Sequence, residues 1–195
     1  DYAYFDIDNY ARAAESAALL CELGHKRIAL INGPADHAFA MERRAGFIET
    51  LGAHGLQVPD SFVFSDSMSD SFGYRSALRA LGGALGKRPT AFICASTMIA
   101  AGVLRAAADK GLSVPRDLSV IAHDDGVPLF NSSEMTPALT VTSSPLTDAC
   151  MPLATLLSIQ LGGKPNETSL QIQQKAEMII RRSTGPVPFG EETSW

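Results

Sequence analysis

The sequence predicts an α/β fold, in which an open and mainly parallel β-sheet carries helices on both faces. Short apolar segments alternate with segments of helical periodicity along nearly the whole chain of 195 residues. The composition, 46% hydrophobic and 19% charged, is that of an ordinary globular protein. Neither a fixed-period repeat nor a low-complexity run interrupts the alternation. Strands that alternate with helices imply right-handed crossovers and therefore parallel pairing.

Each expected element follows from its own local pattern. The apolar segment 4–7 reads as a strand, and Asp8 and Asn9 then suit the start of a helix that continues to Gly24. Four more strands are expected at 27–31, 62–64, 91–95 and 118–122, with helices near 40–52, 71–81 and 100–108 between them. A helix with one apolar face is expected over 146–157. Short strands near 170–172 and 177–180 should end the fold.

Charge and cysteine usage exclude several classes of protein. Lys and Arg number 16 against 21 Asp and Glu, and no basic patch forms, so this chain alone should not bind DNA. No apolar run approaches the roughly 20 residues of a membrane-spanning helix. Cys21, Cys94 and Cys150 are odd in number and widely spaced, which favours free thiols in a reducing cytoplasm. The amino end has neither a Met nor a secretory signal, so we expect a piece of a longer protein.

The loops that follow the strands are the expected place for a ligand. In open α/β sheets these loops converge at the carboxyl edge, where helix amino termini also present free N–H groups. The residues brought together there form a polar set with two apolar walls: Asp36, His37, Phe39, Arg43, Asp66, Met68, Ser96, Thr97, His123, Asp124 and Asp125.

Binding suits this set better than catalysis. The His123-Asp124-Asp125 run resembles an acid–base group, but neighbouring residues of an extended segment point in opposite directions. No nucleophile elbow, metal-ligand spacing or phosphate-binding loop occurs, so no catalytic residue, metal or cofactor is expected. A carboxylate and a guanidinium can hydrogen-bond neighbouring hydroxyls of a polyhydroxylated or heterocyclic ligand.

Six segments, in order, resemble the LacI/GalR family of bacterial transcription regulators. They are IDNYARAA (7–14), GHKRIALINGP (24–34), ERRAGF (42–47), RPTAFICASTMIAAG (88–102), GLSVPRDLSVIAHDD (111–125) and PALTVTSSP (137–145). The resemblance implies a periplasmic-binding-protein-like core of type I, with a sugar or related effector between two lobes. It also implies a homodimer in the cytoplasm that binds operator DNA through a helix-turn-helix domain absent from this chain.

The resemblance also implies how the chain divides. Residues 1–24 and 144–163 would be the remnant of an amino-terminal lobe. Residues 25–143 and 164–195 would form a complete carboxy-terminal lobe.

Seven ligand-binding residues follow from matching positions, in decreasing closeness of match: Arg43, Asp124, His37, Phe39, Met68, Ser96 and Ser144. This sequence departs from the family pattern where Ser96 replaces Asn, Thr97 replaces Asp and His123 replaces an aromatic residue. Simpler roles stay open at this point. Arg43 would then be a solvated helix residue, Asp124 a turn cap and Ser96 a helix cap, with Phe39 and Met68 in the core.

The expected function is therefore an effector-binding and dimerisation core that is not an enzyme. A periplasmic sugar receptor of a transporter would share the fold and the site, and a secretory signal would distinguish it. An α/β enzyme acting on a small sugar or nucleotide would need a base or nucleophile near Asp124.

Overall fold

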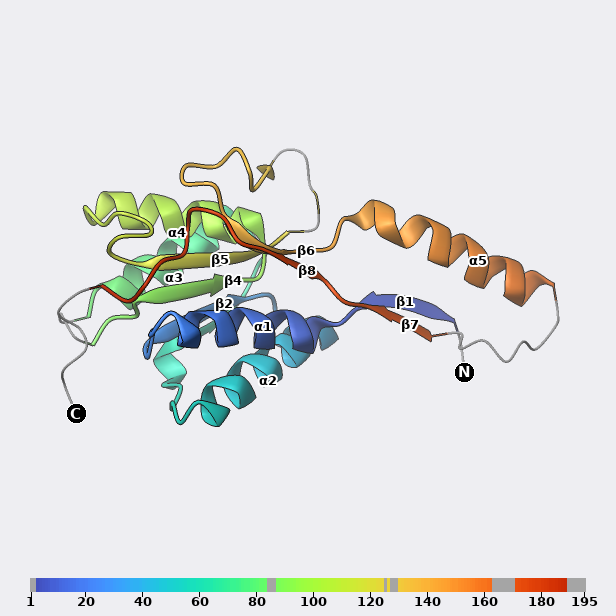
Figure 1. Cartoon of the computed structure of the whole chain (residues 1–195), viewed down its shortest axis with the longest axis horizontal. Coiled ribbons are helices and arrows are strands. Elements are labelled where there is room, and N and C mark those ends of the chain that lie inside the picture. Colours follow the sequence, from blue (N-terminus) through green and yellow to red (C-terminus); the bar gives the residue numbers. More distant parts are fainter. Residues whose placement is uncertain (1–2, 84–86, 125, 127–129, 163–170, 189–195) are drawn as a thin grey trace.

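A six-stranded sheet in the order β3-β2-β4-β5-β6-β8 forms the centre of the protein. The structure is a computed structural model that describes residues 3–83, 87–124, 126, 130–162 and 171–188. Every strand pair in this sheet is parallel except the last, since β8 runs antiparallel to β6. Two helices cover each face of the sheet (Figure 1). The predicted fold class is confirmed.

The elements lie close to their expected positions. In chain order they are β1 (Tyr4–Ile7), α1 (Asn9–Glu22), β2 (Ile28–Asn32), α2 (Ala38–Ala53), η1 (Asp60–Phe62), β3 (Val63–Ser65), α3 (Asp70–Leu81), β4 (Ala91–Cys94), α4 (Thr97–Asp109), β5 (Ser119–Asp124), β6 (Thr140–Ser143), η3 (Leu146–Ala149), α5 (Cys150–Leu161), β7 (Gln171–Gln174) and β8 (Glu177–Ile179). The sequence pattern did not predict β6.

The polar strand β6 is buried because its hydroxyl groups are hydrogen-bonded. Thr140 and Thr142 are fully buried, and the Thr140 hydroxyl meets the Thr184 hydroxyl at 2.9 Å. The backbone N–H of Arg181 also donates to the Thr140 hydroxyl, at 2.9 Å. A buried polar side chain is tolerated when it finds such partners. These partners come from the tail, more than 40 residues away, so local pattern does not reveal them.

The core consists of two apolar layers, one on each face of the sheet. Side chains of consecutive strand residues point to opposite faces. Ile28 and Leu30 of β2 therefore pack with α1 and α2, whereas Ile31 packs with α3 and α4. Phe47 of α2 is fully buried in the first layer, and Phe92 of β4 in the second. Strands buried on both faces account for the unbroken apolar runs of the sequence.

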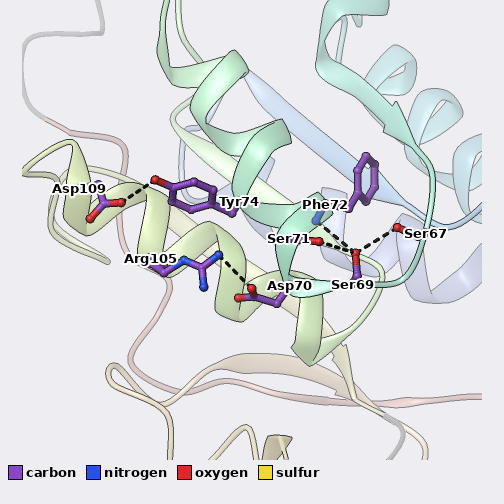
Figure 2. Close-up of polar contacts among 8 residues, drawn as sticks. All are labelled: Ser67, Ser69, Asp70, Ser71, Phe72, Tyr74, Arg105 and Asp109. Atoms are coloured by element: carbon purple, nitrogen blue, oxygen red, sulfur yellow. Dashed lines mark hydrogen bonds and ion pairs between the residues drawn. The ribbon is translucent and has the colours of Figure 1, made fainter.

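Helices on the same face approach each other closely at glycines. A Cβ atom on Gly73 of α3 would lie 2.2 Å from the Ile99 carbonyl oxygen, and one on Gly102 of α4 would lie 2.1 Å from that of Asp70. Polar contacts flank this crossing (Figure 2). Asp70 pairs with Arg105 at 2.9 Å, and the Tyr74 hydroxyl donates to Asp109 at 2.8 Å. The close packing of α3 against α4 therefore requires residues without side chains at the centre of the crossing.

Gly46→Ala is expected to destabilise the protein by about 1–3 kcal/mol, because the added methyl group overpacks the contact of α2 with α1. A Cβ atom on Gly46 would lie 2.3 Å from the backbone oxygen of Tyr10. Urea unfolding followed by circular dichroism measures the loss. Gly52 of the same helix is the matched control, because a Cβ atom there meets nothing within 4 Å. Gly52→Ala should leave stability equal or raise it by about 0.5–1 kcal/mol. A Gly46→Ala protein as stable as wild type would contradict the close packing.

A second, smaller unit lies beside the main sheet. β1 and β7 form a two-stranded parallel sheet, and α5 lies next to β1 (Figure 1). The chain passes between the two units three times, near Asp8, near Ser144 and between β7 and β8. A helix with one apolar face was expected over 146–157. In this structure Leu146, Met151, Leu153, Leu157 and Leu161 are exposed, and Leu156 is buried.

The observed packing differs from the expected division in two places. α1 was expected to belong with the amino-terminal remnant, but it packs against α2 and buries Ala13, Ala17 and Leu20 in the core of the main sheet. β7 was expected in the carboxy-terminal lobe and instead pairs with β1. We therefore place α1 with the main sheet, and β1, β7 and α5 with the smaller unit. Residues 163–170 and 189–195 lie outside the described part of the chain.

His25 attaches the end of the chain to the amino edge of the main sheet. This side chain is 1% exposed. Its Nε2 donates to the Gly185 carbonyl oxygen at 3.1 Å, and its Nδ1 lies 2.9 Å from the Thr90 hydroxyl. Because a carbonyl only accepts, Nε2 carries the proton of the neutral ring. Burial lowers the pKa of His25, and the hydrogen bond to Gly185 opposes this shift. The neutral ring thus suits this contact.

Candidate functional site

The carboxyl ends of β2 to β6 lie at one edge of the main sheet, because these strands are parallel. The loops there carry the residues that the sequence singled out. Asp125 lies outside the described residues.

An aromatic and a thioether side chain meet above Gly33, directly after β2. A Cβ atom on Gly33 would lie 2.6 Å from Phe39 Cζ and 3.2 Å from Met68 Sδ. The absence of a side chain at Gly33 therefore lets the two residues approach the strand end. Both are partly buried. The ring of the exposed His37 meets Phe39 edge-on, with centroids 5.7 Å apart. The structure thus brings together His37 and Phe39 at the start of α2 and Met68 of the β3–α3 loop.

Arg43 of α2 connects the wall formed by Phe39 and Met68 to other residues at this edge of the sheet. Its guanidinium carbon lies 4.9 Å from the centroid of the Phe39 ring. Its Nε donates to Asn9 Oδ1 at 2.9 Å, and its Nη1 donates to the Ala95 carbonyl oxygen at 3.1 Å. Arg43 is 5% exposed, so it is not the solvated helix residue of the simpler alternative. A guanidinium over an aromatic face is a favourable pairing that also fixes the orientation of both groups.

Asp124 ends β5 and is partly buried. One carboxylate oxygen accepts the backbone N–H of Gly126 at 2.8 Å, and the other accepts the Ser132 hydroxyl. Asp124 therefore does cap a turn, which is its simpler role. An ionised carboxylate has about four acceptor positions, so these contacts leave capacity for a ligand.

A buried arginine that the sequence analysis missed lies beneath Asp124. Arg12 of α1 is 1% exposed, and its Nη2 donates to the carbonyl oxygens of Thr142 at 3.1 Å and Asp124 at 3.3 Å. Asn9, the partner of Arg43, starts the same helix. The first turn of α1 thus connects Arg43 to Asp124. Both residues lie at the same edge of the sheet.

His123 points away from Asp124, as alternation along a strand requires. Its Nδ1 contacts the Thr142 hydroxyl, and it is 1% exposed. Burial lowers the pKa of His123 well below its usual value, and the positive charges of Arg43 and Arg12 lower it further. The ring is therefore neutral near pH 7, and it is unsuited to the role of a solvent-exposed acid or base.

Ser96 and Ser144 have structural roles at this edge. The Ser96 hydroxyl accepts the backbone N–H of Ile99 at 3.2 Å and so caps α4, as the simpler alternative predicts. Ser144 is 3% exposed, and its backbone N–H donates to the Asp124 carbonyl oxygen at 2.9 Å. Asp66 differs from expectation, because it lines a separate hollow beside β3.

Neither metal chemistry nor disulfide chemistry finds a site in the described residues. There, no cluster of three His, Cys, Asp or Glu side chains could hold a metal ion. Cys21, Cys94 and Cys150 are free thiols, and burial raises the pKa of Cys94. In the described part of the chain, no helix combines the length and the apolar character needed to cross a bilayer.

Comparison with known proteins identifies the family. The model of the periplasmic binding protein-like domain matches residues 17–184, and the chain belongs to this family. The chain is 41% identical over 193 residues to the HTH-type transcriptional regulator AglR of Rhizobium meliloti, which covers 96% of this chain and 52% of that protein. It is 31% identical to the HTH-type transcriptional repressor PurR of Salmonella paratyphi B, covering 97% of this chain and 54% of that protein.

Solved structures place the chain among the LacI-type regulators within that family. A regulatory protein of the LacI family from Chloroflexus aggregans has a TM-score of 0.87 and 27% identity, over 95% of this chain and 64% of that one. The transcriptional regulator CelR in complex with cellobiose has a TM-score of 0.83 and 26% identity, over 93% of this chain and 54% of that one. The LacI-family resemblance is confirmed. The chain spans about half the length of the curated relatives it matches.

Proposed function

We propose that this chain is the effector-binding core of a LacI-type transcriptional regulator that takes a sugar or a related small molecule. One observation carries the proposal. Arg43 and Phe39 of α2 and Met68 of the β3–α3 loop form a guanidinium and apolar wall at the carboxyl edge, and α1 connects that wall to Asp124. Sugars are bound by such combinations of charged hydrogen-bonding groups and apolar faces.

The proposed ligand-binding residues are Arg43, Asp124, His37, Phe39, Met68, Ser96 and Ser144. Arg43 and Asp124 would bond ligand hydroxyls, and Phe39 and Met68 would contact an apolar face. The cellobiose complex of CelR supports a sugar as the ligand class. The relatives are transcriptional regulators, which supports binding without catalysis and does not favour a periplasmic receptor.

In this proposal the ligand bridges the two units, and its binding changes the angle between them. The three chain passages near Asp8, Ser144 and the β7–β8 connection would act as the hinge. A ligand shifts such an equilibrium only if it contacts the two conformations differently, so both units must touch it. The change would reach a helix-turn-helix domain that binds operator DNA in a cytoplasmic homodimer.

A thermal-shift screen of the complete gene product tests the ligand class, because a ligand that binds the folded state raises the melting temperature. The screen contains mono- and disaccharides, including cellobiose, and a few purines. A sugar hit supports the proposal. A hit among the purines alone, or turnover of the bound compound, contradicts the ligand class or the absence of catalysis, respectively.

Asp124→Ala is expected to weaken binding of the sugar found in that screen by about tenfold to a hundredfold, because a charged hydrogen bond contributes about 1.5–3 kcal/mol. Calorimetry measures the affinity. Ser132→Ala is the matched control, since it removes the hydroxyl contact to Asp124 and keeps the carboxylate. It should change affinity less than about threefold. Unchanged affinity in Asp124→Ala, or equal losses in both variants, would leave Asp124 with only its turn-capping role.

A further inference from the structure

A hollow of about 340 Å³ lies between the edge strand β3 and α3, apart from the Phe39 and Arg43 wall. Its volume is within the range of small-molecule sites. β3 pairs with β2 on one side only among the described strands, so the hollow is at the outer edge of the sheet. The residues that line it include Phe64, Asp66, Phe72, Arg75, Ser76 and Arg79.

One stripe of α3 supplies the helical wall of this hollow. Phe72, Arg75, Ser76 and Arg79 are spaced at i, i+3, i+4 and i+7, which places them on one face of a helix. Most helix faces that border a core carry apolar residues along such a stripe. Here two guanidinium groups and a hydroxyl lie on it instead.

Both arginines lack a carboxylate partner in the described part of the chain. Arg75 and Arg79 are exposed, and neither makes a hydrogen bond or ion pair with any described residue. The guanidinium carbon of Arg79 lies 6.0 Å from the centroid of the Phe64 ring. The Asp66 carboxylate lines the same hollow and accepts the backbone N–H of Ser67 at 2.8 Å. The side chains that line the hollow therefore carry a net charge of one positive.

Ser76 adds a neutral hydrogen-bonding group to the hollow. Its side chain is 4% exposed and lines the hollow, and its hydroxyl has no hydrogen-bond partner among the described residues. Two other helical serines of this protein bond their own helix. Ser16 donates to the Arg12 carbonyl oxygen at 2.8 Å, and Ser158 donates to that of Ala154 at 2.9 Å. The Ser76 hydroxyl lines the hollow without a partner among the described residues, so it is available to a bound molecule.

We propose that this hollow binds a small organic phosphate. A phosphate dianion offers three acceptor oxygens, and Arg75, Arg79 and Ser76 supply three donor groups along one helix face. Each of its two negative charges can pair with one guanidinium. The carbon skeleton of the ligand lies against Phe64 and Phe72. This site is separate from the proposed effector site and does not depend on it.

The test is calorimetric titration of the full chain with phenyl phosphate, with inorganic phosphate and phenol titrated in parallel. Phenyl phosphate should bind, and it should bind more tightly than either of the other two probes. Arg75→Gln and Arg79→Gln should each weaken binding by about tenfold, because each removes a charged donor. Ser76→Ala should weaken it by about threefold to tenfold, as expected for a neutral hydrogen bond.

Two matched controls separate the site from general charge effects. Lys110→Gln removes a positive charge from the exposed end of α4, and Ser158→Ala removes a hydroxyl that bonds its own helix. Neither should change the affinity for phenyl phosphate. The proposal is overturned if the wild-type protein does not bind phenyl phosphate at about 10 mM, because a still weaker affinity is not that of a specific site. It is also overturned if the Arg75→Gln/Arg79→Gln double variant retains binding or if Lys110→Gln lowers it equally. The loss of sugar binding in Asp124→Ala would occur independently of all these outcomes.

Discussion

Arg43→Ala is expected to lower stability by about 2–4 kcal/mol and to weaken sugar binding by about tenfold to a hundredfold. The loss of stability follows from two buried acceptors. Without the guanidinium, Asn9 Oδ1 and the Ala95 carbonyl oxygen lose donors that now lie at 2.9 and 3.1 Å. An unsatisfied buried polar group costs about 1–3 kcal/mol. Urea unfolding measures the first effect, and calorimetry on the folded variant at low temperature measures the second.

Arg44 is the control for this experiment, because it is the next residue of the same helix and is exposed. Arg44→Ala removes the same charge and should change stability by no more than about 0.5 kcal/mol. Its sugar affinity should equal that of wild type. If Arg43→Ala loses stability but keeps full sugar affinity, then Arg43 has only a structural role, which is to hold α2 against α1 and β4. If neither property changes, the hydrogen bonds described here do not contribute.

The sheet and its helices were predictable because parallel strands buried on both faces have a strong sequence pattern. IALIN and AFIC are continuous apolar runs, and the helices between them repeat small apolar residues at helical spacing. β6 gave no such pattern, since the partners of its threonines come from the tail. For α5 the opposite occurred, because an apolar face was predicted and its leucines are exposed. Helical periodicity predicts an apolar face but does not say what covers it.

The sequence predicted the position of the candidate site and missed the buried polar residues beneath it. Position relative to the strand ends was sufficient to find Arg43 and Asp124, because parallel strands bring their carboxyl ends together. Arg12 was missed because an arginine is rarely fully buried. Asn9, which starts the same helix, was missed with it. A signal for them did exist. Asn9, Arg12 and Ser16 lie on the same stripe of α1 as Ala13, Ala17 and Leu20, which form its buried face.

Acidification below pH 6.5 is expected to destabilise the protein steeply, because two histidines are buried in neutral form. Burial lowers the pKa of His123 well below its usual value, and burial also lowers that of His25. Between the unfolded and folded pKa values, the unfolded chain binds a proton that the folded protein does not. Stability is therefore fully present above about pH 6.5 and is lost as the pH falls toward the folded pKa values.

Each histidine contributes at most about 1.4 kcal/mol per pH unit to this loss, so the two together reach about 2.7 kcal/mol per pH unit. Urea unfolding at a series of pH values between 7 and 5 measures the slope. His123→Phe should remove about half of it, since an aromatic ring fills the same buried position without titrating. The remaining half belongs to His25, whose protonation places a charge beside Thr90 and the Gly185 carbonyl oxygen.

His54→Gln is the control, because His54 is exposed at the C-cap of α2. This variant should keep the wild-type slope. The contribution of His123 should also depend on Arg43, because the positive charge of Arg43 opposes protonation of the ring. In Arg43→Ala the pKa of the folded His123 should rise, so the pH range over which its contribution is lost should be narrower than in wild type. A wild-type slope in His123→Phe would mean that carboxylates or His25 alone determine the acid sensitivity, and that the neutral ring beside Arg12 and Arg43 contributes nothing to it.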